Sequence, residues 1–212
     1  MGIELNPQQV ETQVSKSDDL ITEIENKNIV SNKNISQAIY VQLLNPEQCK
    51  SIINSVETEL WEDGGVSGNP DVKYLRKVKT QALPVGQNGW PYTIINELLQ
   101  FVNKEKYKFD CTGILDNDLP QILKYEENDY FDWHIDVGNE YPTRKLSFII
   151  QLSDEKDYEG GDIEMLNAKL TPLSKKQGSV IIFPSYLTHK IKKITKGTRY
   201  SIVGWIHGNS FK

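Results

Sequence analysis

The chain is short of cysteine and histidine. Its 212 residues include two cysteines and three histidines. Cys49 and Cys111 lie far apart and form no C-x-x-C pair, so we expect neither a disulfide scaffold nor a thiolate-rich structural zinc site. Imidazole chemistry is therefore restricted to three positions, His134, His189 and His207.

Excess positive charge and long apolar runs are also missing. A net charge of −5 and a pI near 5.3 do not provide the basic face that a general nucleic-acid binder needs, so we expect no nucleic-acid partner. No run approaches the roughly 20 apolar residues of a membrane span, and the first residues lack the pattern of a signal peptide. We expect a cytoplasmic protein with no membrane partner.

Two regions of the chain differ in amino-acid composition. Residues 1–38 are polar and poor in aromatics, with one weak helical pattern through Leu20, Ile21 and Ile24. We interpret them as an N-terminal extension, with a docked helix as the alternative. Residues 39–212 have the length and composition of one globular domain.

The stretch "NPEQCKSIINSVETELW" (45–61) predicts a helix. Asn45 can cap it, Pro46 suits the first helical position, and Gln48 can complete a capping box. Its apolar residues recur at helical spacing and predict one buried face: Cys49, Ile52, Ile53, Val56 and Leu60. Cys49 is therefore expected in the core and not as a reactive thiol.

A second helix is predicted after Pro91, with one apolar side formed by Ile95, Leu98, Leu99 and Val102. Between the helices, residues 62–90 are rich in glycine and basic residues. Loops of this length are often lids or binding loops. The alternative is a surface excursion that contains a strand near "KYLRKVKT" (73–80).

From Leu119 onward, short β-branched or aromatic segments alternate with turn residues, as in "RKLSFIIQLS", "GSVIIFPS" and "TRYSIVGWIHG". The residues Leu146, Phe148, Ile150 and Leu152 alternate along one face. This pattern predicts an α+β protein that is mainly β: a sandwich or jelly roll with the helices packed on the outside.

The stretch "YFDWHIDVGNEY" (130–141) contains a His-x-Asp pair. On a strand, residues i and i+2 point to the same side, so His134 and Asp136 would present two neighbouring metal ligands while Ile135 faces the core. His189 is the first candidate for a third ligand. Two histidines and one carboxylate form the facial triad of non-haem Fe(II) oxygenases.

Arg199 follows His189 by ten residues, and "ITKGT" between them predicts a hairpin turn. With a three-residue loop, cross-strand pairing would place Arg199 and Ser201 on the same face as His189, whereas a two-residue loop would place His189 out of phase. An inward arginine needs an anion, and its planar fork suits a carboxylate.

The segments "YEENDYFDWHID", "YEGGDIE" and "GSVIIFPSYLTHKIKKITKGTRYSIVGW" together resemble the Fe(II)- and 2-oxoglutarate-dependent dioxygenases, most closely the prolyl 4-hydroxylase-type branch. The resemblance covers roughly residues 38–208 and implies a double-stranded β-helix (jelly roll) core. It implies iron binding by His134, Asp136 and His189, and pairing of Arg199 with the distal carboxylate of 2-oxoglutarate.

Further roles follow from the same resemblance. Ser201 would support the cosubstrate, and Tyr125 would hydrogen-bond it. Gln151 stands where several relatives place a tyrosine or threonine on the cosubstrate. Gly160 and Gly161 fit a tight turn before a strand.

The implied reaction hydroxylates a C–H bond while 2-oxoglutarate is converted to succinate and CO2. Fe(II), 2-oxoglutarate and O2 are the expected cofactors, with ascorbate as a further candidate. A peptidyl proline fits the nearest branch, with Arg76, Lys77 and Lys79 as candidate peptide contacts. A small-molecule hydroxylase and a catalytically silent binding module are the alternatives.

Other residues near these motifs have simpler interpretations. We expect Trp133 and Trp205 to be packing residues, and His207 to lie at a strand end and not to be a fourth ligand. Trp205 also stands where alkylated-base repair enzymes usually carry a second arginine, which disfavours nucleic acid again. Tyr130 and Asp132 are candidates for the substrate mouth.

Overall fold

The computed structural model describes residues 37–64, 74–83, 89–166 and 175–211. The helical pattern at Leu20 to Ile24 lies outside the described residues, and so does nearly all of the predicted extension at 1–38. The division at residue 38 therefore stays a prediction, although the first described strand does begin at Ile39.

The described residues form two α-helices, one 3-10 turn, one π-helical turn and fourteen strands. The helical elements are α2 (Pro46–Asn54), η1 (Thr58–Leu60), α3 (Gly89–Val102) and η3 (Asn103–Tyr107). The strands are β1 (Ile39–Gln42), β2 (Glu62–Asp63), β3 (Arg76–Lys77), β4 (Lys79–Ala82), β5 (Cys111–Gly113), β6 (Gln121–Tyr125), β7 (Tyr130–His134), β8 (Arg144–Gln151), β9 (Tyr158–Gly160), β10 (Ile163–Met165), β11 (Ser179–Pro184), β12 (His189–Ile191), β13 (Ile194–Gly197) and β14 (Arg199–Gly208).

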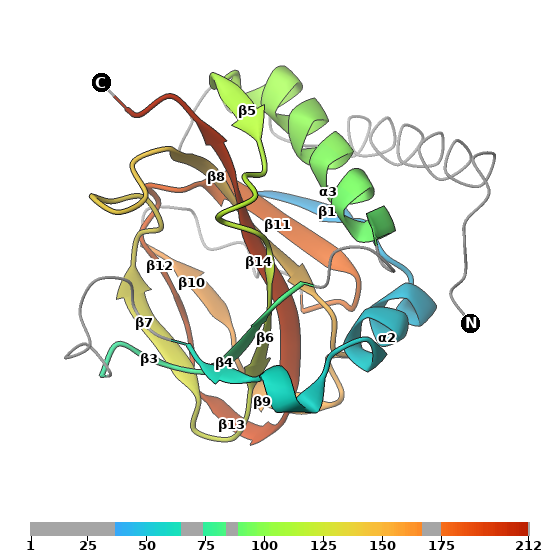
Figure 1. Ribbon diagram of the computed structural model, residues 1–212. Helices are drawn as coiled ribbons and strands as arrows, with labels where there is room; N and C mark the ends of the chain where they lie inside the picture. The colour runs from blue at the N-terminus through green and yellow to red at the C-terminus, as the bar shows by residue number, and fades with distance from the viewer. Residues whose placement is uncertain (1–36, 65–73, 84–88, 167–174, 212) are drawn as a thin grey trace.

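Two main antiparallel sheets, a separate two-stranded sheet and a helical layer make up the architecture (Figure 1). The large sheet has the order β1-β11-β8-β14-β6-β4-β2, with β5 also paired to β14. The small sheet has the order β10-β12-β7-β3, and β13 pairs with β9 at one end. Helices α2 and α3 cover the side of the large sheet that faces away from the small one. This arrangement confirms the predicted jelly roll with helices outside.

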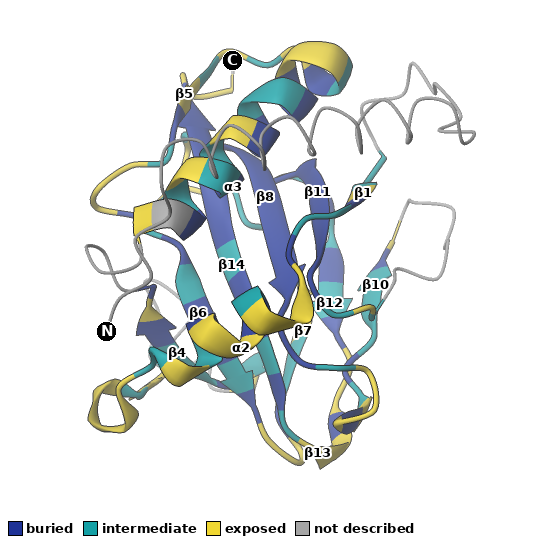
Figure 2. Cartoon of the chain, turned by 90° about the vertical axis from the view of Figure 1, so that its right-hand side faces the viewer, coloured by how far each residue is buried: buried dark blue, intermediate teal, exposed yellow. Residues whose placement is uncertain are grey.

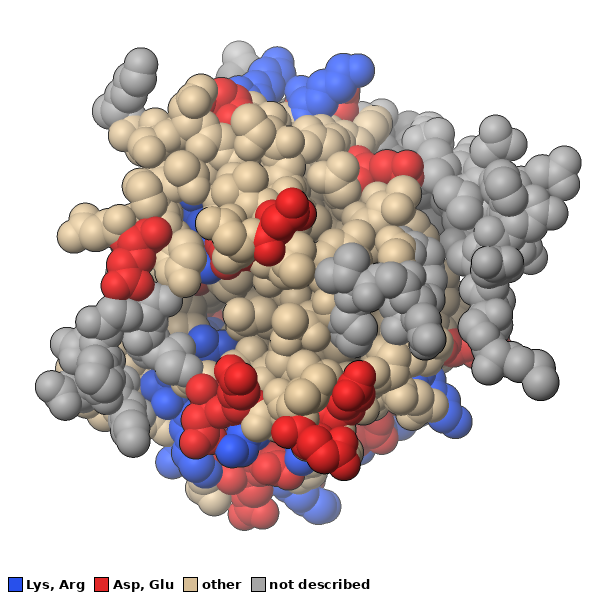
Figure 3. Space-filling view, viewed as in Figure 1, with Lys and Arg blue, Asp and Glu red and all other residues tan. Residues whose placement is uncertain are grey.

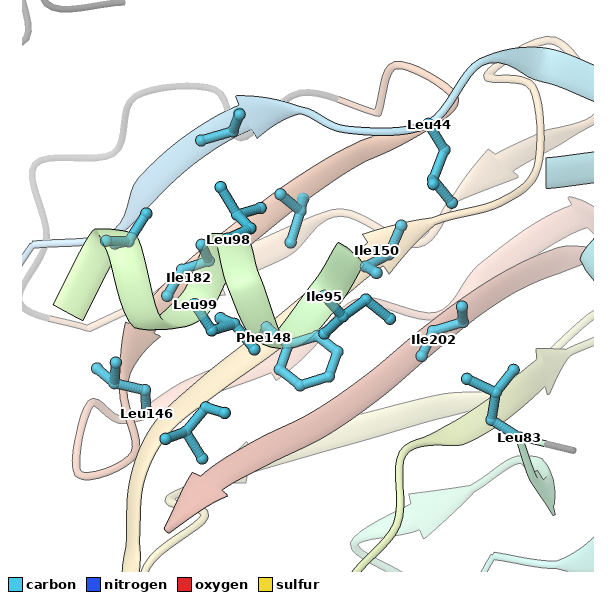
Figure 4. Close-up of a cluster of buried hydrophobic side chains, with 14 of the residues drawn as sticks. Leu44, Leu83, Ile95, Leu98, Leu99, Leu146, Phe148, Ile150, Ile182 and Ile202 are labelled. Carbon is cyan, nitrogen blue, oxygen red and sulfur yellow. The ribbon is translucent and has the colours of Figure 1, made fainter. Parts of the chain in front are cut away.

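Side chains of β8 alternate between two apolar cores, and the strand is buried along its whole length (Figure 2). The even-numbered residues Leu146, Phe148 and Ile150 pack with α3 in the core beneath the helices (Figure 4). Ile149 belongs to the second core, which lies between the two sheets. The predicted alternation is confirmed, and it leaves one face of β8 available to a site.

Helix α2 begins as predicted and ends early. The capping box is present, with Gln48 N donating to Asn45 Oδ1 and Asn45 N donating to Gln48 Oε1, both at 2.9 Å. The predicted continuation to Trp61 is wrong, because the Gln81 side chain binds both the N–H and the carbonyl of Glu57 and draws the chain toward β4. Leu60 is consequently 53% exposed and not buried.

Of the other residues predicted on the buried face of the first helix, Cys49 and Ile52 are buried, whereas Ile53 and Val56 are only partly buried. The apolar side of α3 is buried at all four predicted positions, Ile95, Leu98, Leu99 and Val102, although the helix already begins at Gly89. Cys49 is fully buried, and burial raises the pKa of its thiol to about 12. A thiol with that pKa stays protonated at neutral pH, as expected of a core residue.

The region 62–90 contributes strands to both sheets. The strand predicted near residues 73–80 is confirmed as β3 and β4. Strand β3 pairs with β7 in the small sheet, and β4 pairs with β6 in the large sheet. Residues 65–73 and 84–88 lie outside the described residues, so the predicted lid or binding loop is not tested there.

The predicted hairpin between His189 and Arg199 is wrong. Strand β12 pairs with β7 and β10, whereas β14 pairs with β8, β6 and β5. The intervening β13 pairs with β9 and carries the chain from one sheet to the other. His189 and Arg199 therefore belong to opposite sheets and face a common space from two sides.

Acidic and basic side chains lie interleaved at the lower end of the molecule in Figure 3. Ion pairs among the described residues include Glu164 with Lys190 at 3.0 Å and with Lys192 at 2.6 Å. Such half-exposed pairs contribute little to stability, so the fold depends mainly on its two apolar cores. No helix in the described residues is both long and apolar enough to cross a membrane.

We predict that Leu146→Ala destabilises the protein by about 3 to 5 kcal/mol, because it leaves a cavity in the core beneath the helices. Leu60→Ala is the matched control, since the same truncation at an exposed position changes the free energy of unfolding by no more than about 0.5 kcal/mol. Urea unfolding of both variants measures the difference. Equal effects would contradict the assignment of the core.

Candidate metal centre and cosubstrate cavity

All three predicted metal ligands come together. One ligand atom each of His134, Asp136 and His189 lies within 4.8 Å of the other two, the one group of this kind among the described residues. His134 Nε2 is 3.6 Å from Asp136 Oδ1, and His189 Nε2 is 3.7 Å from Asp136 Oδ2. The histidines are direct cross-strand partners on β7 and β12, which explains why their rings lie 4.1 Å apart.

Both imidazoles are oriented by the main chain. His134 Nδ1 lies 2.7 Å from the carbonyl of Asp132, and His189 Nδ1 lies 2.9 Å from the carbonyl of Leu187. A hydrogen on each Nδ1 can be donated to these carbonyls, so each Nε2 presents its lone pair to the centre. Burial and the neighbouring His189 lower the pKa of His134 to about 4, which keeps it neutral at pH 7.

Asp136 is held as a carboxylate. Burial raises its pKa, but the two imidazoles and hydrogen bonds from Ser147 and Trp205 outweigh burial and keep the pKa below its ordinary range. Ser147 Oγ donates to Asp136 Oδ2 at 2.6 Å. Neutral imidazoles and an ionised carboxylate are the donor set that suits Fe(II).

Asp136 lies beyond the strand that carries His134. Strand β7 ends at His134, so the expectation that both ligands share a strand is wrong. Ile135, expected in the core, is 49% exposed, and it follows the last residue of β7. The Asp136 N–H instead donates to the carbonyl of Ser185, which turns the carboxylate toward the histidines.

An inner cavity runs from the triad into the space between the sheets. Arg199, Ser201 and Tyr125 contribute polar groups to its lining. The remaining walls are largely apolar and include Leu123, Ile149, Ile191 and Val203. An apolar cavity with a few convergent polar groups is the usual form of a small-ligand site.

Arg199 provides the charge of the inner cavity, and it is 1% exposed. Its Nε donates to Gln151 Oε1 at 3.0 Å, and Nη1 donates to Ser201 Oγ at 3.3 Å. Among the described residues no carboxylate pairs with it, so a ligand carboxylate would supply the missing anion. Tyr125 is its cross-strand partner, with the guanidinium 5.4 Å from the ring centre.

Gln151 hydrogen-bonds Arg199 but is not part of the cavity lining. Its Oε1 accepts from Arg199, and its Nε2 donates to the hydroxyl of Tyr158 at 3.0 Å. It does not line the inner cavity in the way that Ser201 and Tyr125 do. The structure thus gives Gln151 the position of a support for the arginine.

The predicted tight turn at Gly160 and Gly161 is confirmed. Both have positive φ, +82° and +64°. A Cβ at Gly161 would lie 2.6 Å from Ile194 Cδ1, 3.0 Å from Arg199 Cδ and 3.2 Å from Tyr158 Cε2. The turn therefore needs glycine both for its backbone conformation and for the close approach of the arginine.

An outer groove leads from the triad to the surface. One wall comes from β2 and β4 and the other from residues 137–141. Both cavities share five residues: Arg76, Phe131, His134, Asp136 and Trp205. The triad therefore lies at the junction of an inner cavity and an open groove.

The aromatic residues near this junction differ from expectation. Tyr130 and Asp132 are absent from both linings, whereas Phe131 between them stacks on His134 with ring centres 3.5 Å apart. Trp205 is buried but also lines both cavities. The packing role expected of Trp133 is wrong, since that ring is 37% exposed beneath Lys190.

Comparisons with known proteins identify the family. A model of the 2OG-Fe(II) oxygenase superfamily matches residues 120–207. A PKHD-type hydroxylase of Synechococcus sp. (strain CC9311) is 38% identical over 173 residues, which cover 78% of this chain and 76% of that protein. The chain belongs to the 2OG-Fe(II) oxygenase superfamily. The resemblance seen in its motifs is confirmed, and Fe(II), 2-oxoglutarate and O2 are the cofactors of this hydroxylase.

Solved structures share the fold of this oxygenase. A prolyl hydroxylase from Trichoplax adhaerens, in complex with a hypoxia inducible factor oxygen degradation domain peptide fragment, has a TM-score of 0.67 at 16% identity and covers 96% of this chain and 94% of its own. A prolyl-4-hydroxylase of Pseudomonas putida has a TM-score of 0.66 at 14% identity, with 82% and 94% covered. At these identities the likeness concerns the fold.

Three residues of this oxygenase site were missed by the sequence analysis: Ser147, Tyr158 and, as a hydrogen-bond donor, Trp205. Ser147 is a polar residue within the apolar part of β8, on the face opposite to Leu146, and Gln151 lies on the same face as Ser147 four residues later. Polar residues that repeat on one face of a buried strand are a signal that could have located the site.

We predict that His134→Ala and Asp136→Ala each abolish Fe(II) binding and succinate formation, because each removes one of three donor groups. Equilibrium dialysis with Fe(II) under nitrogen and an assay for succinate measure the two losses. Asp110→Asn is the control, a carboxylate outside both cavities that pairs with Lys145. Wild-type binding in either alanine variant would refute the triad.

We predict that Arg199→Met raises the Kd of 2-oxoglutarate about 100-fold, about 2.7 kcal/mol, because a buried charge partner of the distal carboxylate is lost. Calorimetry on the Mn(II)-loaded protein measures the Kd. 2-Oxobutyrate lacks the distal carboxylate and should bind the variant and the wild type equally. An unchanged Kd for 2-oxoglutarate would remove Arg199 from the cosubstrate site.

Proposed function

We propose that this oxygenase hydroxylates a prolyl residue of a peptide or protein substrate. His134, Asp136 and His189 would hold Fe(II), while Arg199 and Ser201 would bind the distal carboxylate of 2-oxoglutarate and Tyr125 would hydrogen-bond it. When bound, the iron and the cosubstrate supply the oxidation of a C–H bond with release of succinate and CO2. Ascorbate is proposed as an auxiliary cofactor.

The observation that carries the proposal is the position of the triad between two different cavities. The inner one is largely apolar and is lined by a buried arginine, which suits a small dicarboxylate. The outer groove is open along its length, which suits an extended chain that presents one side chain to the centre. This division supports placing the cosubstrate in the inner cavity and the substrate in the outer groove.

The prolyl substrate is supported by the relatives. Several proteins that are similar in sequence are named PKHD-type hydroxylases, and two neighbours in fold are prolyl hydroxylases. One of those neighbours was solved with a peptide. Arg76 lines both cavities here, whereas Lys77 and Lys79 form ion pairs with Asp129 and Asp63. Of the three candidate peptide contacts, only Arg76 is placed at the triad.

We predict that proline-containing peptide pools gain one oxygen atom in the presence of Fe(II), 2-oxoglutarate and O2, with an equal yield of succinate. Mass spectrometry locates the oxygen on proline. Matched pools with alanine in place of proline, and the Asp136→Ala protein, are the controls. Oxidation of the alanine pools, or succinate formation that no peptide stimulates, would reject the prolyl substrate in favour of a small molecule.

A further inference from the structure

The triad carboxylate lacks the support that the two histidines have. His134 and His189 lie on paired strands, whereas Asp136 follows the end of β7. The residues that follow it, 137–141, form a wall of the open groove. A ligand in such a segment keeps its geometry only if neighbouring groups fix it.

Arg144, the first residue of β8, contacts this segment. Its Nη1 donates to the main-chain carbonyl of Asp136 at 3.3 Å. The guanidinium carbon lies 3.3 Å from the ring centre of Trp205 on one side and 3.6 Å from that of Tyr141 on the other. Trp205 in turn hydrogen-bonds the Asp136 carboxylate. Arg144 thus reaches Asp136 directly through its backbone and indirectly through Trp205.

Asp118 fixes Arg144 in turn. Two parallel hydrogen bonds of 2.7 Å join Arg144 Nε and Nη2 to the two carboxylate oxygens of Asp118. His207 Nε2 lies 3.1 Å from the same carboxylate, and His207 Nδ1 lies 2.9 Å from Thr143 Oγ1. The bidentate pair with Asp118, together with the aromatic rings of Trp205 and Tyr141 against the planar guanidinium, holds Arg144 in one orientation.

Although Arg144 lines the groove, its guanidinium pairs with the Asp118 carboxylate of the protein itself. Asp118, Arg144 and His207 are all less than 10% exposed. Burial raises the pKa of Asp118, but hydrogen bonds from His207 and Arg144 outweigh it, so the carboxylate stays ionised and balances the arginine. A neutralised, buried pair of this kind contributes orientation more than net attraction for a substrate.

We infer that Arg144, locked by Asp118, is the positioning residue that holds Asp136 in place for the metal. This inference rests on the proposed metal centre. If it holds, loosening Arg144 lowers metal affinity even though no atom of the pair coordinates the ion.

Asp118→Asn tests the inference, with Asp110→Asn as the matched control. Each substitution weakens an ion pair to a neighbouring basic residue of β8, Arg144 for Asp118 and Lys145 for Asp110, and only the first pair leads to Asp136. The Kd and the visible absorption spectrum of the Co(II)-loaded full chain are measured, together with the melting temperature of the metal-free protein. Arg144→Lys is the second variant, since it keeps the positive charge if Asp118→Asn fails to fold.

We expect Asp118→Asn and Arg144→Lys to raise the Kd for Co(II) about 10- to 100-fold and to alter the Co(II) spectrum, as loss of support around a ligand does. Asp110→Asn should leave both unchanged. Wild-type Kd and spectrum in the two test variants, or an equal loss in the control, would overturn the inference. Failure of the wild-type protein itself to bind Co(II) would overturn the metal centre on which it rests.

Discussion

The site depends on the register between β8 and β14. Three cross-strand pairs of these strands face the space between the sheets: Ser147 with Trp205, Ile149 with Val203, and Gln151 with Ser201. The first pair hydrogen-bonds Asp136, the second lines the inner cavity and the third contacts Arg199. A shift of one residue would exchange these side chains with the apolar ones that pack beneath the helices, so the same register fixes the core and the site.

The small sheet contributes the two histidines of the site through the pairing register of β7 and β12. His134 and His189 are paired across β7 and β12, opposite the floor provided by the large sheet. Each sheet alone holds only part of the chemistry: imidazoles on one, and the arginine with its supporting polar groups on the other. The centre is therefore assembled only when the two sheets pack against each other. The apolar core between them includes Phe183 and Ile191.

Local patterns in the sequence predicted much of this. The alternation through Leu146 to Leu152, the capped start of α2 and the residue types of the triad follow from short-range periodicity and chemistry. Pairing partners do not, because β12 and β14 are close in sequence yet join different sheets through contacts with strands far along the chain. The support of Asp136 by Ser147, Trp205 and Arg144 was missed for the same reason. The early end of α2 depends on Gln81, a residue outside the helix.

The turn at Gly161 has a consequence for how this protein can vary. Its φ is positive and a Cβ there would meet Ile194 before Arg199, so a mutational library at this position should be depleted of every side chain whatever its polarity. Such intolerance would look like the signature of a catalytic residue, although glycine takes no part in any reaction. Here sequence invariance would record a lack of space for any side chain among Ile194, Arg199 and Tyr158.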